Sequence, residues 1–282
     1  MSETMTMLPL SHFSNDVFSQ YGEDGILAKI FDLIGTTSRV CIEFGAWDGF
    51  RLSNTANLWT KGWRGVLIEG ERDRCELLRE NVKRYNCLCL NAFVTRAGEN
   101  SLEAILHRNQ VAGEIDLLSI DIDGDDYYIF DSLEHLRPRV VVCEYNPTIP
   151  PDIDLYADCG SYFGASITAI SRVAESKGYS LVAITDTNGI FVLKSLTAPF
   201  HQFETRFDRI KLTKHLTYLV TSFAGDFTRC GTTPFGVGIP YVGNLNGPHQ
   251  SCASMGCWPR SVGTRILRRL KTLAKQVLEK SR

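Results

Sequence analysis

The sequence of 282 residues lacks any run of about 18 apolar residues, so we expect no segment that spans a membrane. Its first residues, MSETMTMLPLSHFSND, lack the basic start and the long apolar stretch of a secretory signal peptide. No pair among its nine cysteines has the C-x-x-C spacing of a zinc knuckle or a redox motif. Their odd number and scattered positions favour a reducing compartment, and we predict a cytoplasmic protein.

The composition is that of an ordinary globular protein, with 44% hydrophobic and 22% charged residues. The net charge is −2, but eight basic residues and one acidic residue lie between Arg260 and Arg282. Residues 264–280 predict a basic amphipathic helix, which could lie on an anionic membrane surface or pack its apolar face on the domain. Aromatic residues do not alternate with the basic ones there, which disfavours nucleic-acid binding.

Short apolar runs alternate with segments of helical spacing. The helical spacing predicts helices over 23–34, 52–61, 74–85, 100–108, 125–136 and 165–177. The apolar runs predict buried strands over 39–44, 65–69, 87–94, 115–121 and 139–144. Five strands that alternate with helices predict an α/β domain, in which a parallel sheet has helices on both faces.

The chain after residue 178 breaks this alternation. The runs 180–185 and 190–194 flank Asp186-Thr-Asn-Gly189, and Asn188-Gly189 is a strong hairpin signal. We therefore predict a mostly parallel seven-stranded sheet that ends in an antiparallel hairpin. This ending is unusual for nucleotide-binding Rossmann domains, and it resembles the Rossmann-like fold of class I methyltransferases.

The segment Glu43-Phe-Gly-Ala-Trp-Asp-Gly49 follows directly on the first predicted strand. Its glycines would let the backbone approach a ligand closely, and the next helix would present free N–H groups there. The acid two residues before the first glycine suits a cationic ligand, such as the ammonium group of a methionine moiety. The alternative is a simple strand-to-helix turn whose carboxylate is satisfied within the protein.

Glu69 ends the next predicted strand, 20 residues after Gly49. A carboxylate at this place can accept hydrogen bonds from both hydroxyls of a ribose. An exposed acid at the end of a strand is the alternative. The two acids at this spacing together favour S-adenosylmethionine (SAM) as the ligand.

Further acids follow the fourth and fifth predicted strands, where ligands of open α/β sheets bind. Asp121, Asp123 or Glu144 could act as the general base that takes a proton from an acceptor hydroxyl. With Asn146, their oxygens could instead hold a hard divalent ion such as Mg²⁺. Helix capping by Asp123 or Asp125, with Glu144 held by backbone N–H groups, is the alternative without chemistry.

Several motifs within residues 19–194 resemble those of the FkbM-type family of SAM-dependent methyltransferases. They are Ser19-Gln-Tyr-Gly-Glu-Asp24, Ile42-Glu-Phe-Gly-Ala46, Leu67-Ile-Glu69, Ile120-Asp-Ile-Asp-Gly124, Val142-Cys-Glu144 and Asn188-Gly189. The resemblance implies a class I methyltransferase domain over 1–198. It leaves residues 199–282 as a C-terminal extension with the basic amphipathic helix.

The resemblance also implies roles for single residues. The cofactor loop would comprise Glu43, Phe44, Gly45, Ala46 and Gly49. Glu69 would bind the ribose, Gln20 in the lead-in would cover the cofactor, and Asp121 would lie beside the methionine or acceptor end. The loop departs from the family pattern, which more usually begins with Asp and continues Gly-Ala-Asn, because Trp47-Asp48 follow here. Asp123 likewise replaces the more usual Glu.

The family implies SAM as methyl donor and often a sugar or polyketide hydroxyl as acceptor. We therefore predict an O-methyltransferase acting on a small-molecule, sugar or lipid-linked acceptor, such as a carbohydrate, a glycolipid or a related natural product. A peripheral membrane contact through residues 264–280 would suit a lipid-linked acceptor. Tyr156, Tyr162 and Phe163 in the loop 147–163 could stack on a ring of the acceptor, and His201 or His215 could enter the site.

Two other functions compete with this prediction. A non-catalytic SAM-binding module would bind the cofactor without methylating any acceptor. A nicotinamide-dependent oxidoreductase would need a dinucleotide site, but the fingerprint G-x-G-x-x-G is absent and the terminal hairpin argues against it.

Overall fold

The computed structural model describes residues 7–216, 218–230 and 242–244. These residues fall into two compact units. The first unit comprises the described residues up to 216, and the second comprises Tyr218–Cys230 with Val242–Asn244. The first unit continues past the predicted domain boundary at residue 198, because Phe200 and Ile210 are buried in its core.

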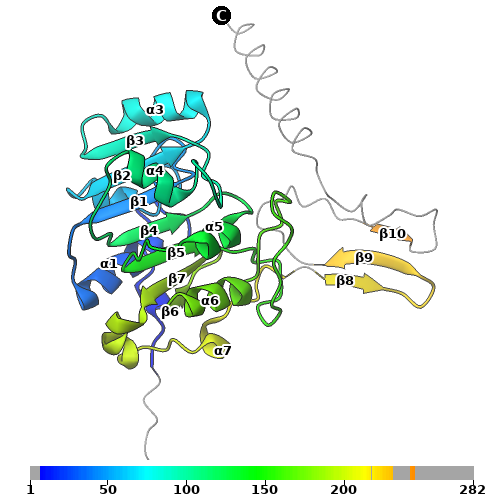
Figure 1. Ribbon diagram of the computed structural model, residues 1–282. Helices are drawn as coiled ribbons and strands as arrows, with labels where there is room; N and C mark the ends of the chain where they lie inside the picture. Colours follow the sequence, from blue (N-terminus) through cyan, green and yellow to red (C-terminus); the bar gives the residue numbers. More distant parts are fainter. Residues whose placement is uncertain (1–6, 217, 231–241, 245–282) are drawn as a thin grey trace, which may run out of the picture. The chain divides into compact units, whose positions relative to one another are not determined.

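A seven-stranded sheet forms the centre of the first unit (Figure 1). Its strands are β1 (Val40–Phe44), β2 (Arg64–Glu69), β3 (Cys87–Asn91), β4 (Leu117–Ile120), β5 (Val140–Glu144), β6 (Tyr179–Ile184) and β7 (Asn188–Leu193). Their order is β3-β2-β1-β4-β5-β7-β6. Strands β1 to β5 pair in parallel, whereas β7 runs antiparallel to both β5 and β6. The predicted fold class is confirmed: the fold is Rossmann-like, with a mostly parallel seven-stranded sheet that ends in an antiparallel hairpin.

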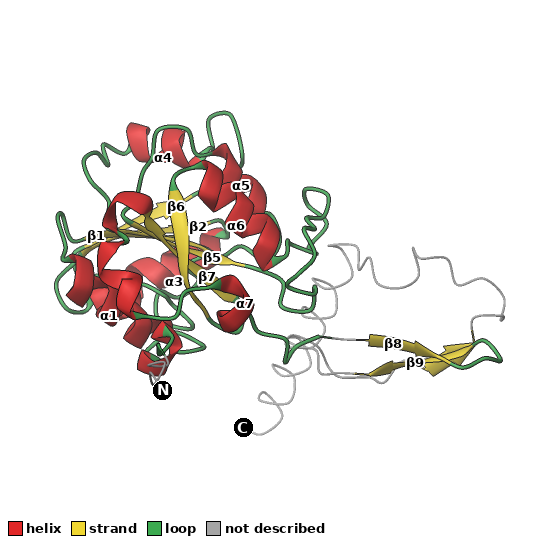
Figure 2. Cartoon of the chain, turned by 90° about the horizontal axis from the view of Figure 1, so that it is seen from below, coloured by secondary structure: helices red, strands yellow, loops and turns green. Residues whose placement is uncertain are grey.

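Helices cover both faces of this sheet. They are α1 (Glu23–Ile34), α2 (Ala56–Trp59), α3 (Arg72–Val82), α4 (Leu102–Arg108), α5 (Asp126–Ser132), α6 (Ile167–Ser176) and α7 (Phe207–Ile210). Short 3₁₀ helices occur at η1 (Leu10–Phe13), η2 (Lys194–Leu196) and η3 (Ala198–Gln202). Figure 2 shows α4, α5 and α6 on one side of the sheet and α1 and α3 on the other.

Two apolar clusters fill the space between the sheet and its helices. Successive strand residues alternate between them, so that Cys41 and Leu117 belong to one cluster and Ile42 and Leu118 to the other. All four side chains are fully buried. Burial of an aliphatic side chain of this size contributes about 2 kcal/mol. The near-continuous apolar runs of the sequence therefore follow from burial on both faces.

The predicted helix over 52–61 forms only as α2, Ala56–Trp59. Leu52 has a left-handed φ of 57°, which is incompatible with an α-helix. The side chains of Ser53 and Thr55 both donate hydrogen bonds to Glu43, at 2.6 and 2.7 Å. These contacts with Glu43 hold Ser53 and Thr55 in a loop, although helical spacing alone placed them in the first turns of the predicted helix.

The hairpin is present, but Asn188-Gly189 is not its turn. Both residues belong to β7 and pair with Glu144 and Cys143 of β5. The turn lies at residues 185–187, and none of residues 185–189 has the positive φ that a type I′ Asn-Gly turn requires. The prediction of the turn residues was therefore wrong. The side chain of Asn188 instead donates to Glu23, at 3.0 Å.

The second unit is a small antiparallel sheet of β8 (Tyr218–Thr221), β9 (Asp226–Cys230) and β10 (Val242–Asn244), in the order β10-β9-β8. The predicted amphipathic helix over 264–280 lies outside the described residues. Within the described part of the chain, no helix combines the length and the apolar character needed to cross a bilayer.

Candidate active site

The loop after β1 is pressed against the start of the segment that follows β4. Gly45 has a φ of +80°, and a Cβ at this position would lie 2.0 Å from the carbonyl oxygen of Asp121. The N–H groups of Gly45 and Ala46 both donate to the carbonyl of Ile68, at 3.1 and 3.2 Å. Only glycine can fill such a position without moving the backbone. The loop is thereby fixed between the ends of β2 and β4.

Glu43 lies beneath this loop and is satisfied within the protein. Its carboxylate accepts hydrogen bonds from Ser53 Oγ, from Thr55 Oγ1 and from the backbone N–H of Asn54, at 2.6, 2.7 and 2.8 Å. Burial raises the pKa of Glu43, and these hydrogen bonds partly oppose the rise. The geometry matches the alternative of a satisfied carboxylate, and a direct contact of Glu43 with the cofactor stays a prediction.

Glu69 ends β2 beside the same loop. One carboxylate oxygen accepts the N–H of Trp47 at 2.9 Å, and the other accepts the N–H of Glu71 at 2.8 Å. Each oxygen has a second lone pair. Glu69 therefore fixes the loop and keeps acceptor capacity that a pair of ribose hydroxyls could use.

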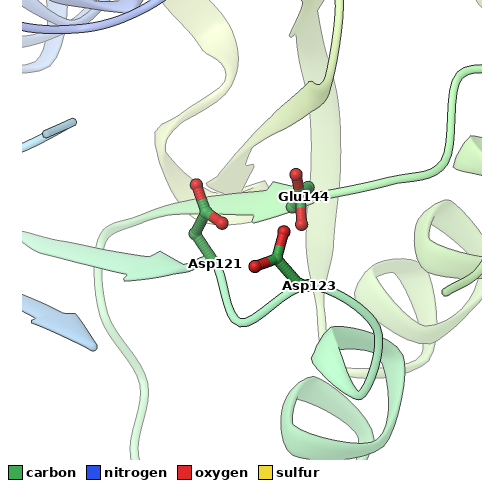
Figure 3. A group of neighbouring side chains, drawn as sticks. All are labelled: Asp121, Asp123 and Glu144. Atoms are coloured by element: carbon green, nitrogen blue, oxygen red, sulfur yellow. The ribbon is translucent and has the colours of Figure 1, made fainter. Parts of the chain in front are cut away.

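Three carboxylates meet where β4 and β5 end. Asp121 and Asp123 follow β4 directly, and Glu144 is the last residue of β5. Figure 3 shows the three side chains pointing toward one another, and one oxygen from each lies within 4.8 Å of the others. Asp123 has a left-handed φ of 59°. The structure thus brings together all three residues predicted to be catalytic, and we call them the acid cluster.

Burial makes ionisation of the acid cluster unfavourable, and repulsion between the carboxylates adds to this for Asp121 and Glu144. Burial, followed by the charges of Asp126 and Asp123, raises the pKa of Asp121 well above its usual range. Burial, followed by the charges of Asp121 and Asp126, does the same to the pKa of Glu144. Burial also raises the pKa of Asp123, against the lowering effect of Arg74. A bound proton or a bound cation would relieve this repulsion.

Asp126 is a fourth acid that the sequence prediction missed. It is the first residue of α5, and its carboxylate accepts the N–H groups of Ile122 and Gly124, at 2.9 and 2.8 Å. Burial raises its pKa to about 6, although these hydrogen bonds lower it. It follows two residues after the Ile120–Gly124 motif in the sequence, but only the fold shows that its carboxylate accepts hydrogen bonds from that motif.

Asn146 is close to the acid cluster, but its side chain is already engaged. Its amide oxygen accepts the N–H and the hydroxyl of Thr148, at 2.9 and 2.6 Å. Its Nδ2 donates to the carbonyl of Phe163 at 2.8 Å. Asn146 therefore fastens the loop that carries the aromatic residues, and its role as a metal ligand stays a prediction.

A cavity of about 260 Å³ opens beside these groups. Its lining combines acids, glycines, one asparagine and three aromatic residues, and comprises Asp123, Gly124, Asp126, Glu144, Tyr145, Asn146, Tyr162, Phe163 and Gly164. A Cβ at Gly124 would lie 2.9 Å from the Cα of Tyr162. This close approach brings the two loops together. Tyr156 lies outside the lining and stacks on Tyr127 at 4.3 Å between ring centroids.

The lead-in before α1 folds back tightly on the helix. One oxygen of Asp24 accepts the N–H groups of Val17, Phe18 and Ser19, at 2.9, 2.7 and 2.9 Å. Glu23 accepts the N–H of Tyr21 at 2.8 Å, together with the Thr185 hydroxyl at 2.5 Å. This arrangement holds the lead-in at the edge of the sheet where the strands β5 and β6 end.

Gln20 and Tyr21 form the tip of the lead-in, and Gln20 Nε2 donates to the Tyr21 hydroxyl at 3.0 Å. Burial, followed by the charges of Asp186 and Glu23, raises the pKa of Tyr21, and Glu144 adds to the effect. The phenol therefore lies within electrostatic range of Glu144 and of the β6–β7 turn. The sequence prediction did not include Tyr21.

The β6–β7 turn also contacts the segment that follows α7. Asp186 contacts His215 Nε2 at 2.8 Å and Lys214 Nζ at 2.5 Å. His215 thus lies at the β6–β7 turn, whereas His201 lies exposed on η3, and entry of either residue into the site stays a prediction.

No protein-family model matches the sequence, and a search of curated proteins finds no match. Among solved structures, the chain is similar to an O-methyltransferase from Bacillus cereus in complex with S-adenosylhomocysteine, with 17% identity and a TM-score of 0.42 over 63% of this chain and 84% of that chain. It is also similar to a precorrin-6y C5,15-methyltransferase from Geobacter metallireducens, with 15% identity and a TM-score of 0.39 over 63% and 90% of the two chains. A SAM-dependent methyltransferase from Aquifex aeolicus matches with 10% identity and a TM-score of 0.37 over 61% and 89%. Similarities this weak carry no information about substrate or reaction.

Proposed function

We propose that this chain is a SAM-dependent methyltransferase that methylates a hydroxyl of a carbohydrate, a glycolipid or a related natural product. The observation that carries the proposal is the arrangement at one edge of the sheet. Three features lie along this edge: the glycine loop after β1, the buried acid Glu69 that ends β2, and the acid cluster at the ends of β4 and β5. Ligands of open α/β sheets bind at this edge.

The cofactor would lie over Gly45, Ala46 and Gly49, with its ribose on Glu69 and with Gln20 covering it. Glu69 suits this role because its fixed oxygens retain lone pairs for two hydroxyl donors. Asp121 would lie near the sulfonium end, where a negative charge attracts the cation. When bound, SAM supplies an electrophilic methyl group.

The acid cluster would handle the proton of the acceptor hydroxyl. The raised pKa of Asp121 and of Glu144 makes each a better proton acceptor than an ordinary carboxylate. Both are fixed by strand ends, so the acceptor oxygen can be held in line for transfer, and such positioning supplies much of a rate enhancement. Asp123 shares the site and lines the cavity.

As an alternative to the role in proton transfer, the acid cluster would hold Mg²⁺. The donor set fits this ion, because three carboxylate oxygens from two neighbouring strand ends lie within 4.8 Å of one another. A bound Mg²⁺ would relieve the repulsion among the acids and acidify an acceptor hydroxyl. Asn146 would support this site through the loop rather than as a ligand, because Thr148 occupies its amide oxygen.

The acceptor would enter the cavity beside the acid cluster. Tyr162 and Phe163 offer ring faces for a sugar or a related ring, and both side chains are exposed. A lipid-linked acceptor, a membrane contact through residues 264–280 and a cytoplasmic location all stay predictions.

Calorimetric titration with S-adenosylhomocysteine tests the proposal. We expect wild type to bind, Glu69→Gln to bind about tenfold more weakly, and the exposed neighbour Glu71→Gln to bind as wild type does. No binding of S-adenosylhomocysteine to wild type, or binding of NAD in its place, would overturn the proposal and favour the oxidoreductase.

A second titration tests the metal. Mn²⁺ should bind wild type and should lose at least tenfold in affinity in Asp121→Asn, because a ligand oxygen loses its charge. Unchanged Mn²⁺ affinity in this variant would remove the metal from the proposal and leave the acids as proton acceptors. A chain that binds S-adenosylhomocysteine and methylates no hydroxyl acceptor would be the non-catalytic module.

A further inference from the structure

Trp47 holds an unusual conformation in the cofactor loop. Its φ is +46°, in the left-handed region that bulky residues rarely adopt. Its backbone N–H donates to Glu69 at 2.9 Å, so the strained residue is fixed beside the proposed ribose acid. Strain of this kind persists where the surrounding structure requires it, and it concentrates at functional sites.

The side chains of Arg51 and Arg74 both lie over the Trp47 ring in cation–π contacts. The guanidinium of Arg51 lies 4.6 Å from the ring centroid, and that of Arg74 lies 5.1 Å from it. Guanidinium groups at such distances are attracted by the ring quadrupole. The two arginines come from different segments, the loop after β1 and the helix α3, and the ring is what they share. Their charges are therefore gathered at one place on the rim of the cofactor loop.

These cations are only partly neutralised. Within residues 7–216, no carboxylate lies within ion-pair distance of Arg51. Arg74 has a single contact with Glu71, at 3.4 Å between exposed side chains, which is worth little in solvent. The two guanidinium groups therefore keep N–H donors for a carboxylate of a ligand at the loop after β1.

The rest of this edge is acidic. Glu69, Asp121, Asp123 and Glu144 would attract the sulfonium and ammonium groups of SAM and repel its carboxylate. A zwitterionic ligand bound here needs a separate cationic contact for that group. Arg51 and Arg74 offer one, because a guanidinium fork matches a carboxylate with two parallel hydrogen bonds.

We propose that Arg51 and Arg74, held on the ring of Trp47, bind the α-carboxylate of the cofactor. This inference rests on the proposed function, since it names the residues that read one end of SAM. Trp47 acts as a positioning residue. It spaces the two guanidinium groups and presents them on the same rim as Glu69.

Calorimetry with two ligands tests the inference. The first ligand is S-adenosylhomocysteine, and the second is 5′-(3-aminopropylthio)-5′-deoxyadenosine, which is the same molecule without its carboxylate. We expect Arg51→Ala and Arg74→Ala each to weaken the first ligand about tenfold. The second ligand should bind wild type and both variants with equal affinity. Arg51 is exposed and Arg74 is half-buried, so we expect both variants to fold as wild type does.

Arg72→Ala is the matched control, because Arg72 lies on the same helix, has the same charge and pairs with Glu76 instead of the Trp47 ring. It should leave the affinity for both ligands unchanged. Equal weakening by Arg72→Ala, equal effects on both ligands, or no effect of the two arginine variants would each overturn the inference. Those results would leave the proposed function intact. Failure of wild type to bind S-adenosylhomocysteine would overturn both.

Discussion

Gly45 has the tightest backbone contact in the candidate site. An added methyl group would lie 2.0 Å from the carbonyl oxygen of Asp121, on a residue whose φ is already +80°. Nearly any side chain would push the cofactor loop away from β4. The residue therefore controls the distance between the loop and the acid cluster, and not only the shape of a turn.

Gly45→Ala should lower the free energy of unfolding by about 2–4 kcal/mol, because it adds a steric clash to the cost of a left-handed alanine. It should also weaken binding of S-adenosylhomocysteine. Urea unfolding and calorimetry measure the two effects. The matched control is Gly62→Ala, since Gly62 has a φ of +92° but nothing within 4 Å of an added Cβ. Equal losses of stability in the two variants would show that φ alone matters and that the contact with Asp121 does not.

For single residues, the sequence predicted where the site residues lie in the fold better than it predicted which contacts they make. Strand ends and glycines marked Gly45, Glu69, Asp121 and Glu144 correctly as neighbours at one edge of the sheet. The hydrogen bonds of Glu43 were not predictable, because its partners Ser53 and Thr55 return to it through a loop that has no periodic pattern. The same holds for the Trp47 stack, whose two arginines lie 4 and 27 residues further along the chain.

The lead-in before α1 is held by a buried carboxylate. Glu23 is fully buried and accepts hydrogen bonds from Tyr21, Thr185 and Asn188. It thereby joins the lead-in to the β6–β7 turn, and it orders the segment that carries Gln20. An isolated buried carboxylate is costly, so these three hydrogen bonds help to hold the lead-in against the sheet.

Glu23→Gln should loosen this element without unfolding the domain. The NH2 group that replaces one carboxylate oxygen cannot accept a hydrogen bond, so Glu23→Gln loses at least one of the three bonds that Glu23 accepts now. We expect amides of residues 17–22 to exchange at least tenfold faster. Hydrogen exchange with mass spectrometry measures this. Asp32→Asn is the control, because Asp32 is an exposed residue of the same helix that pairs only with Lys29 in the described part of the chain. Unchanged protection in Glu23→Gln would mean that Asp24 alone holds the lead-in.

Two predicted elements changed for the same reason. Helical spacing over 52–61 and the Asn188-Gly189 pair are local signals. In both places, contacts with other parts of the chain impose a different structure from the one the local signal predicts. Asn188 donates a hydrogen bond to Glu23, which lies 165 residues away in the sequence. Local patterns could predict the buried strands well, because a continuous run of apolar residues is stable only where both of its faces are buried.

At the scale of the whole unit, one ion pair closes the edge of the sheet opposite the site. Asp116 is fully buried before β4 and contacts Arg139 Nη1 at 2.7 Å. Arg139 also donates to the carbonyls of Ile34 and Gly35, at 2.8 and 2.7 Å. The pair thus connects the end of α1 to the entries of β4 and β5. Burial alone would raise the pKa of Asp116, but hydrogen bonds from Arg139 and from backbone N–H groups lower it overall.

The sign of the resulting pH dependence follows from this lowered pKa. The pKa of Asp116 in the folded chain lies below its value in the unfolded chain, which is about 3.9. Its contribution to stability is therefore present above that pH and is lost as the pH falls through the folded pKa. Asp116→Asn should cost about 3 kcal/mol at pH 7, and its difference from wild type should shrink in acid below about pH 4.

Urea unfolding from pH 7 to pH 3 tests this expectation. The control is Asp154→Asn, which breaks the exposed pair of Asp154 with Arg172 and should cost under about 1 kcal/mol. A loss in Asp116→Asn that stays constant with pH would show that packing, and not the charge, accounts for the effect.

The β6–β7 turn has a consequence for how this chain is made. It receives Glu23 from the lead-in on one side and His215 from the segment after α7 on the other. On the ribosome, the glycine loop and the acid cluster emerge long before this turn does, and Glu23 remains without Thr185 and Asn188 until then. The nascent chain therefore carries the residues of the site in an edge that is still open. The hydrogen bonds that close this edge can therefore form only once residue 188 has been synthesised.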